Sequence, residues 1–159
     1  MVYLAIDRLR CDACRRNPTK ARPRPTTSTI RYLGQFGEEI MGDMFYVVDV
    51  ANVSYCLLGI ICHGTRLHKV GYVADRNPET VFDVLRTIWL LPFGVPVEAL
   101  FDQDGSFLGF FLEEMERLGV VVRYCPVDAH HQLGLIERHD AAWRWMYSRT
   151  ADAGRRSGT

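Results

Sequence analysis

Short apolar runs along the body of the chain predict five β-strands. Most of these runs are rich in β-branched and aromatic residues, and one alternates polar with apolar positions, as strands do. The polar segment "ANVS" separates the first two runs and predicts a hairpin between them. The expected strands cover residues 38–50, 53–62, 66–74, 95–101 and 120–125.

Three other segments have the periodicity of amphipathic helices. The first covers residues 80–91, the second ends at Gly119, and the last covers residues 130–149 with Asp128 as its expected N-cap. The periodic apolar positions are Val81, Val84, Leu85, Ile88 and Leu91 in the first helix and Phe107, Phe111, Met115 and Leu118 in the second. Three strands followed by alternating helices and strands predict an α/β fold with a mixed five-stranded sheet flanked by helices.

The composition shows that charge is distributed unevenly along the chain. Of the 159 residues, 48% are apolar and 24% are charged, which suits one soluble domain with a real core. The formal net charge is zero, but the segment from Arg8 to Arg31 holds eight basic residues against one acidic residue, Asp12. Basic ends around an acidic centre favour a nucleic-acid partner, with a solvated basic tail as the alternative.

The proline-rich segment "NPTKARPRPTTST", residues 17–29, divides the chain. We expect a short head and basic linker over residues 1–29, a compact body over residues 30–150, and a disordered tail over residues 151–159. No apolar stretch reaches the length of a membrane span, and the start lacks the pattern of a signal peptide. Five cysteines without framework spacing favour a reducing, intracellular compartment, either nucleus or cytoplasm.

Acidic residues at particular places carry the candidate chemistry. The stretch "FDQDGSF" is not a calcium loop, because apolar residues follow its glycine where oxygen ligands are needed. Asp102 instead follows a buried strand, where α/β sheets place their chemistry, and Asp104 is a turn residue. Asp43 lies in the middle of the first strand, where an acid is costly unless paired or metal-bound, with Asp49 as the alternative.

The spacing of these acids resembles that in the catalytic cores of retroviral and retrotransposon integrases, in the ribonuclease H-like superfamily. That family has an Asp on the first strand, an Asp after the fourth, and a Glu about 35 residues later on a helix. Here 34 residues lie between Asp102 and Glu137, and Asp43 is the first-strand acid. Further matches are "PFGVP", Phe107, Gly119 and "GLIER", and the resemblance runs from about Gly37 to Arg149.

The resemblance implies a ribonuclease H-like fold and a DNA partner. It also implies that Asp43, Asp102 and Glu137 are catalytic and hold two Mg²⁺ or Mn²⁺ ions, in an active assembly that is a homo-oligomer. An all-oxygen ligand set suits these ions, and two of them can activate a nucleophile and stabilise a leaving oxygen. The sequence departs from the family at Asp140, where an asparagine is frequent, at Leu135 and at His63. Asp140 is expected to add negative charge to a helix that faces DNA.

Basic residues near Glu137 are candidates for DNA binding. Arg144 shares a helical stripe with Glu137 and is placed to meet a phosphate, and Arg138 and His131 are further candidates. Each of these could instead be a solvated helix residue. Cys11 and Cys14 resemble the second half of the integrase zinc-binding module and predict at most a zinc half-site, because no histidine precedes them.

The function predicted from these features is metal-dependent processing of DNA 3′ ends and strand transfer, that is, DNA integration in a retrotransposon-like element. The alternative is a catalytically inactive DNA-binding remnant of a transposable element that keeps the fold. A ribonuclease H-type nuclease is disfavoured by "GLIER".

Overall fold

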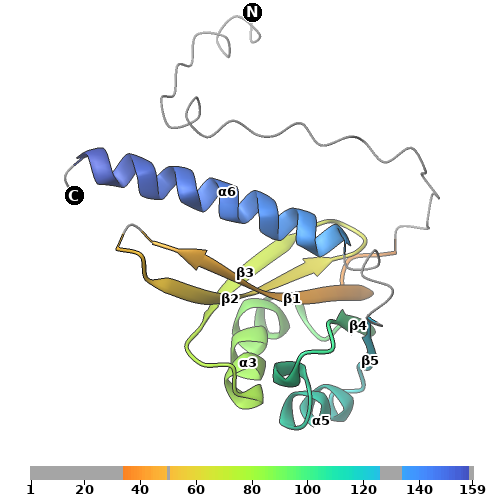
Figure 1. Cartoon of the computed structure of the whole chain (residues 1–159). Coiled ribbons are helices and arrows are strands. Elements are labelled where there is room, and N and C mark those ends of the chain that lie inside the picture. The colour runs from red at the N-terminus through yellow and green to blue at the C-terminus, as the bar shows by residue number, and fades with distance from the viewer. Residues whose placement is uncertain (1–33, 50, 126–133, 158–159) are drawn as a thin grey trace, which may run out of the picture.

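The computed structural model describes residues 34–49, 51–125 and 134–157, which form a five-stranded mixed sheet with helices on both faces (Figure 1). The strands lie in the order β3-β2-β1-β4-β5. The pairs β1–β2 and β2–β3 are antiparallel, whereas β1–β4 and β4–β5 are parallel. The strands are β1 (Glu39–Val48), β2 (Ser54–Cys62), β3 (His68–Val73), β4 (Glu98–Phe101) and β5 (Val121–Tyr124). The predicted α/β fold class is confirmed.

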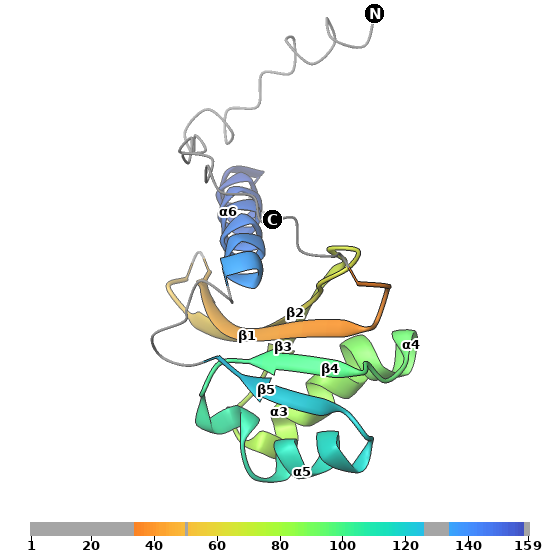
Figure 2. The ribbon, with the colours of Figure 1, turned by 90° about the vertical axis from the view of Figure 1, so that its right-hand side faces the viewer.

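The helices divide unequally between the two faces of the sheet. Figure 2 shows α6 alone on one side, with α3, α4 and α5 on the other. The helical segments are α3 (Pro78–Leu85), the π-helical η1 (Arg86–Leu90), α4 (Leu91–Phe93), the 3₁₀ turn η2 (Gly105–Phe107), α5 (Phe110–Arg117) and α6 (Gly134–Ser157). In the described part of the chain, no helix is both long and apolar enough to cross a lipid bilayer.

Helix α6 corrects one expectation. The sequence predicts that the last helix ends at Arg149 and that residues 151–159 form a disordered tail, whereas residues up to Ser157 are helical. The extension contains alanine and arginine, which favour helix, and no proline. The head and linker over residues 1–29, together with Cys11, Cys14, Asp128 and His131, lie outside the described residues.

The hairpin between β1 and β2 forms where the sequence predicted it. Asp49 organises its turn, because its carboxylate accepts hydrogen bonds from the backbone of Ala51 at 2.8 Å and of Val53 at 2.9 Å. The Tyr55 hydroxyl donates to the same side chain at 3.0 Å. Asn52 takes the left-handed conformation, with φ of 63°, that Asn tolerates better than most residues.

The main apolar core lies between the sheet and the layer of α3, η1 and α5. Phe101, Phe107 and Phe111 are fully buried and pack as a trio with ring centroids 4.7 to 5.2 Å apart. Trp89 and Leu85 fill the same layer further along the sheet. Most of the apolar positions predicted on the first two helices are buried here, although Leu91 is exposed.

Truncating the aromatic core should destabilise the fold strongly. Phe111 is 0% exposed, so Phe111→Ala should cost about 3–5 kcal/mol of unfolding free energy in urea titrations. The neighbouring Phe110 is 40% exposed, and Phe110→Ala should cost only about 1 kcal/mol. Equal losses at the two positions would contradict this packing.

Candidate active site

The pairing of β1 with β4 brings Asp43 and Asp102 together. Gly42 of β1 is paired with Phe101 of β4 in parallel register, and the next residue along the chain after each of them is an aspartate. Neighbouring strands lie about 4.8 Å apart, and residues at matching positions point to the same face. Met41 and Phe45 pack on the α6 side, so Asp43, between them with the same parity, also faces α6.

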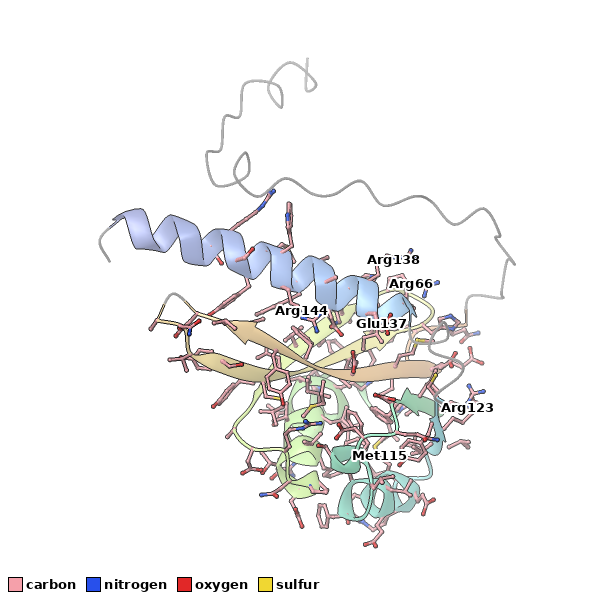
Figure 3. The ribbon with its side chains drawn as sticks, viewed as in Figure 1. Arg66, Met115, Arg123, Glu137, Arg138 and Arg144 are labelled. Atoms are coloured by element: carbon pink, nitrogen blue, oxygen red, sulfur yellow. The ribbon has the colours of Figure 1, made fainter. Side chains whose placement is uncertain are left out.

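Glu137 reaches this region from α6. The residue before it, Ile136, is fully buried and packs in one cluster with Met41 of β1 and Leu100 of β4. The first turn of α6 therefore rests on the same two strands that carry the aspartates. Figure 3 shows Glu137 at the N-terminal end of α6, and its side chain is exposed.

Electrostatic coupling joins the three acids. Burial raises the pKa of Asp43 from 3.8 to about 6, and repulsion from Asp140, Asp102 and Glu137 adds to the increase against an opposing hydrogen bond from the Met44 backbone. That hydrogen bond is 2.8 Å long. A nearby cation stabilises the ionised form of a carboxylate that other carboxylates repel in this way. Asp43 is thus the acid of the site whose ionised form is disfavoured by burial and by its neighbours.

Asp140 does not lie where the sequence analysis expected it. The side chain is 0% exposed and faces the sheet, so it adds no charge to the outer surface of α6. His68 of β3 lies beside it, with Nε2 3.1 Å from Asp140 Oδ1. The expectation of a DNA-facing Asp140 is wrong because the helix turns this position inward, over Gly59 of β2.

Two other aspartates have different partners. Asp49, the alternative first-strand acid, is occupied by the hairpin turn. Asp104 accepts a hydrogen bond from the Ser106 backbone at 2.9 Å, as expected for a turn residue, and also pairs with Arg76. Asp102, by contrast, accepts only from the neighbouring Gln103 backbone, at 2.7 Å, among the hydrogen bonds of the described residues. Its second oxygen accepts no hydrogen bond from a described residue.

The basic residues near the site differ in how they are held. Arg138 and Arg144 are exposed, and the Arg144 guanidinium lies over the Phe45 ring at 5.0 Å while its Nε donates to the Tyr46 carbonyl oxygen at 3.3 Å. Part of the Arg144 side chain is therefore docked on β1. Arg66 was not among the predicted DNA-binding residues; it lies between β2 and β3 with φ of 64°, and Figure 3 labels it together with Arg138 and Glu137.

The donor type and charge of the three acids fit a divalent cation such as Mg²⁺ or Mn²⁺, because all their donors are carboxylate oxygens. No group of three or more His, Cys, Asp or Glu side chains within residues 34–49, 51–125 and 134–157 is close enough to hold one ion jointly. Asp43 and Asp102 are positioned by the sheet and Glu137 by the helix, and the three carboxylates are not drawn together around one point.

Comparison with known proteins places the fold. No family model and no curated protein matches the sequence. A chain in the cryo-EM structure of the simian T-cell lymphotropic virus intasome in complex with PP2A regulatory subunit B56 gamma is similar, with a TM-score of 0.64 and 17% identity. The similarity covers 89% of this chain and 50% of that one.

Isolated integrase cores are also similar. The HTLV-2 integrase catalytic core domain in complex with magnesium, in a trimeric form, has a TM-score of 0.54 and 19% identity, covering 66% of this chain and 65% of that one. The catalytic core domain of BIV integrase has a TM-score of 0.55 and 11% identity, covering 68% and 67%. At these identities the likeness defines the fold, which is the ribonuclease H-like fold of integrase catalytic cores.

The pKa of Asp43 predicts how stability depends on pH. Asp43 ionises near 3.8 in the unfolded chain and near 6 in the folded one, so ionisation costs the fold stability as pH rises between these values. Asp43→Asn removes this loss. Its stability relative to wild type, from urea titrations, should therefore be greater at about pH 8 than at about pH 4.5.

Asp104→Asn is a matched control of opposite sign. Burial opposes ionisation of Asp104, but hydrogen bonds from Ser106 and the pairing with Arg76 outweigh it and lower the pKa. Its ionised form stabilises the fold, so the variant should lose stability relative to wild type as pH rises. The same trend in both variants would show that Asp43 does not have the environment described here.

Proposed function

We propose that the protein is a metal-dependent polynucleotidyl transferase of the integrase type, which processes DNA 3′ ends and transfers them to target DNA in a retrotransposon-like element. One observation carries the proposal: Asp43 and Asp102 follow a register-matched pair on parallel strands, under the turn of α6 that carries Glu137. The catalytic core of HTLV-2 integrase, which has the same fold, is in complex with magnesium, and this supports a divalent ion here.

The roles of the residues follow from their positions. Asp43, Asp102 and Glu137 would hold the ions. When bound, Mg²⁺ or Mn²⁺ activates an attacking oxygen and stabilises the leaving oxygen. Asp43 must lose its proton to serve as a ligand, and its pKa of about 6 couples ion binding to proton release. Asp102 would contribute its second carboxylate oxygen, and Glu137 would contribute an exposed carboxylate from α6.

DNA is the proposed partner, and homo-oligomerisation is proposed for the active assembly. The simian T-cell lymphotropic virus structure is an intasome, and the HTLV-2 core occurs in dimeric and trimeric forms. This chain covers about half of the intasome chain, so the activity of that larger protein is a proposal for this one. A reducing compartment, zinc at Cys11 and Cys14, and DNA contact by His131 stay predictions from the sequence.

A DNA-binding remnant without turnover is the second candidate function. It is favoured by the lack of any closely grouped three-ligand set among the described residues. Both candidates require a surface for DNA, but only the first requires the three acids to act together. Catalysis and binding must therefore be measured separately.

A branched DNA that mimics the product of strand transfer provides the test of catalysis. With Mn²⁺ or Mg²⁺ the wild-type chain should resolve this substrate, and Glu137→Gln should abolish the reaction because one ligand is neutralised. DNA affinity, measured by fluorescence anisotropy, should change little, since the substitution removes no phosphate contact. Activity in Glu137→Gln equal to wild type would exclude this site, and DNA binding without activity in wild type would support the remnant.

The arginines around the first half of α6 are the proposed phosphate contacts. Elsewhere in the described structure arginines pair with acids, as Arg76 does with Asp104 and Arg86 with Asp83. Arg66 and Arg138 have no such pairing with any described residue, and Arg66 Nη1 is enclosed without a hydrogen-bond partner. Unneutralised guanidinium groups beside the acids are suited to a DNA backbone.

The salt dependence of DNA binding tests these contacts. Arg66→Gln and Arg138→Gln should each lower the slope of log affinity against log salt by about one unit, because each removes one phosphate contact. Arg86→Gln is the matched control, since it removes an equal charge from the opposite layer and should leave the slope unchanged. A similar decrease in all three variants would mean that only total charge matters.

A further inference from the structure

Asp140 is a buried charge with an unusual environment. Among the described residues it is the only charged residue in the buried class, at 0% exposure. In the described part of the structure neither carboxylate oxygen has a hydrogen-bond partner, and His68 Nε2 approaches one of them to 3.1 Å without hydrogen-bond alignment. Burying a carboxylate is costly unless an opposite charge compensates it. The His68 imidazole, 3.1 Å away and 11% exposed, is the group placed to do so when it is protonated.

The contact joins elements that are distant in the sequence. His68 is the first residue of β3, the edge strand of the sheet, where it pairs with Ile61 of β2. Asp140 is on α6, whose main packing against the sheet is on β1 and β2. The His68 ring also packs against the His139 ring, with centroids 5.6 Å apart. The pair thus connects the helix to the far edge of the sheet.

Gly59 provides the space that this contact needs. A Cβ atom at Gly59 would lie 2.5 Å from Asp140 Oδ1, which is closer than real contacts allow, and 3.0 Å from His68 Nε2, which is a tight contact. Gly59 is the β2 residue paired with Asp43 of β1. Asp140 therefore rests on the sheet at the position directly beside Asp43. Repulsion from Asp140 is accordingly the largest contribution that another acid makes to the raised pKa of Asp43.

Glu137 lies three residues before Asp140, so the two are neighbours across one turn of α6. We propose that the Asp140–His68 pair, seated over Gly59, is a positioning device that fixes the first turns of α6 on the sheet and thereby sets Glu137 relative to Asp43. Asp140 and His68 are positioning residues in this scheme, since neither reaches the open face of the site. The inference rests on the proposed function, because the expected consequence of this positioning is the affinity of the site for a divalent ion.

The test uses the full chain and titrates it with Mn²⁺ by calorimetry. Asp140→Asn keeps the shape of the side chain but removes its charge, and His68→Gln removes the imidazole. Each should weaken Mn²⁺ binding about 10- to 100-fold, the usual effect of losing a residue that orients a ligand. The double variant should bind no more weakly than the single ones, because all three lack the same contact.

Two controls separate positioning from general destabilisation. His63→Gln removes a comparable contact, since His63 Nδ1 lies 2.8 Å from Glu39 Oε2, but away from α6, and should leave Mn²⁺ affinity unchanged. Trp143→Leu weakens the packing of α6 on Phe45 and should lower the urea midpoint more than Mn²⁺ affinity. Unchanged affinity in Asp140→Asn and His68→Gln, or effects that add in the double variant, would overturn the proposal.

Hydrogen exchange distinguishes this failure from failure of the proposed function. Backbone amides over the first turns of α6 should exchange faster in Asp140→Asn and His68→Gln than in wild type or His63→Gln, whether or not an ion binds. If wild type binds no Mn²⁺, the proposed function fails, and faster exchange in the two variants still supports the pair as the anchor of α6. Unchanged exchange would refute the anchor in either case.

Discussion

The parallel pairing of β1 with β4 is the constraint on which the candidate site depends. Backbone hydrogen bonds fix Gly42 opposite Phe101, and this register places Asp43 beside Asp102 although their like charges repel. A Cβ atom at Gly42 would overlap the Phe101 ring on the opposite face. The glycine that precedes Asp43 thus lets the aromatic core close under the sheet at the same point where the two acids emerge above it.

The two faces of the sheet differ in the residues that cover them. One face is sealed by α3, η1 and α5 with aromatic side chains and no charged residue in its buried cluster. On the other face, Asp43 lies between Met41 and Phe45 under α6. Its raised pKa shows that ionising a carboxyl at this position is unfavourable. A fold selected only for stability would place an apolar residue there. The unfavourable burial of a carboxyl thus occurs at the position where the proposed chemistry needs an acid.

The sequence predicted the strands, the hairpin and the layered α/β fold because these depend on local patterns of apolar residues. It also placed Asp43 and Asp102 correctly relative to their strands, since a strand end and a mid-strand acid are visible in sequence. The inward direction of Asp140 could not be predicted, because a charged helix residue is expected to face solvent. The only signal was Gly59, since glycine inside a strand often marks a close approach of another group.

The end of α6 and the break in the first helix were missed for different reasons. No glycine or proline follows Arg149 until Gly154, so the sequence contained no physical stop at the predicted end. The continuous helix expected over residues 80–91 contains the π-helical η1, and Pro92, which lacks an amide hydrogen, follows that segment. Neither difference can be predicted from the periodicity of apolar residues.

The candidate site therefore has a rigid part and an adjustable part. Asp43 lies within β1 and Asp102 directly follows the last paired residue of β4, so the hydrogen bonds between β1 and β4 limit how far apart the two can move. Glu137 is held only through side-chain contacts of α6, such as those of Ile136 in the cluster with Met41 and of Asp140 against His68. Any closer approach of the three carboxylates must come from α6, because side-chain contacts yield before a ladder of backbone hydrogen bonds does. The anchoring of α6 is accordingly the variable that separates a loose set of acids from a working site.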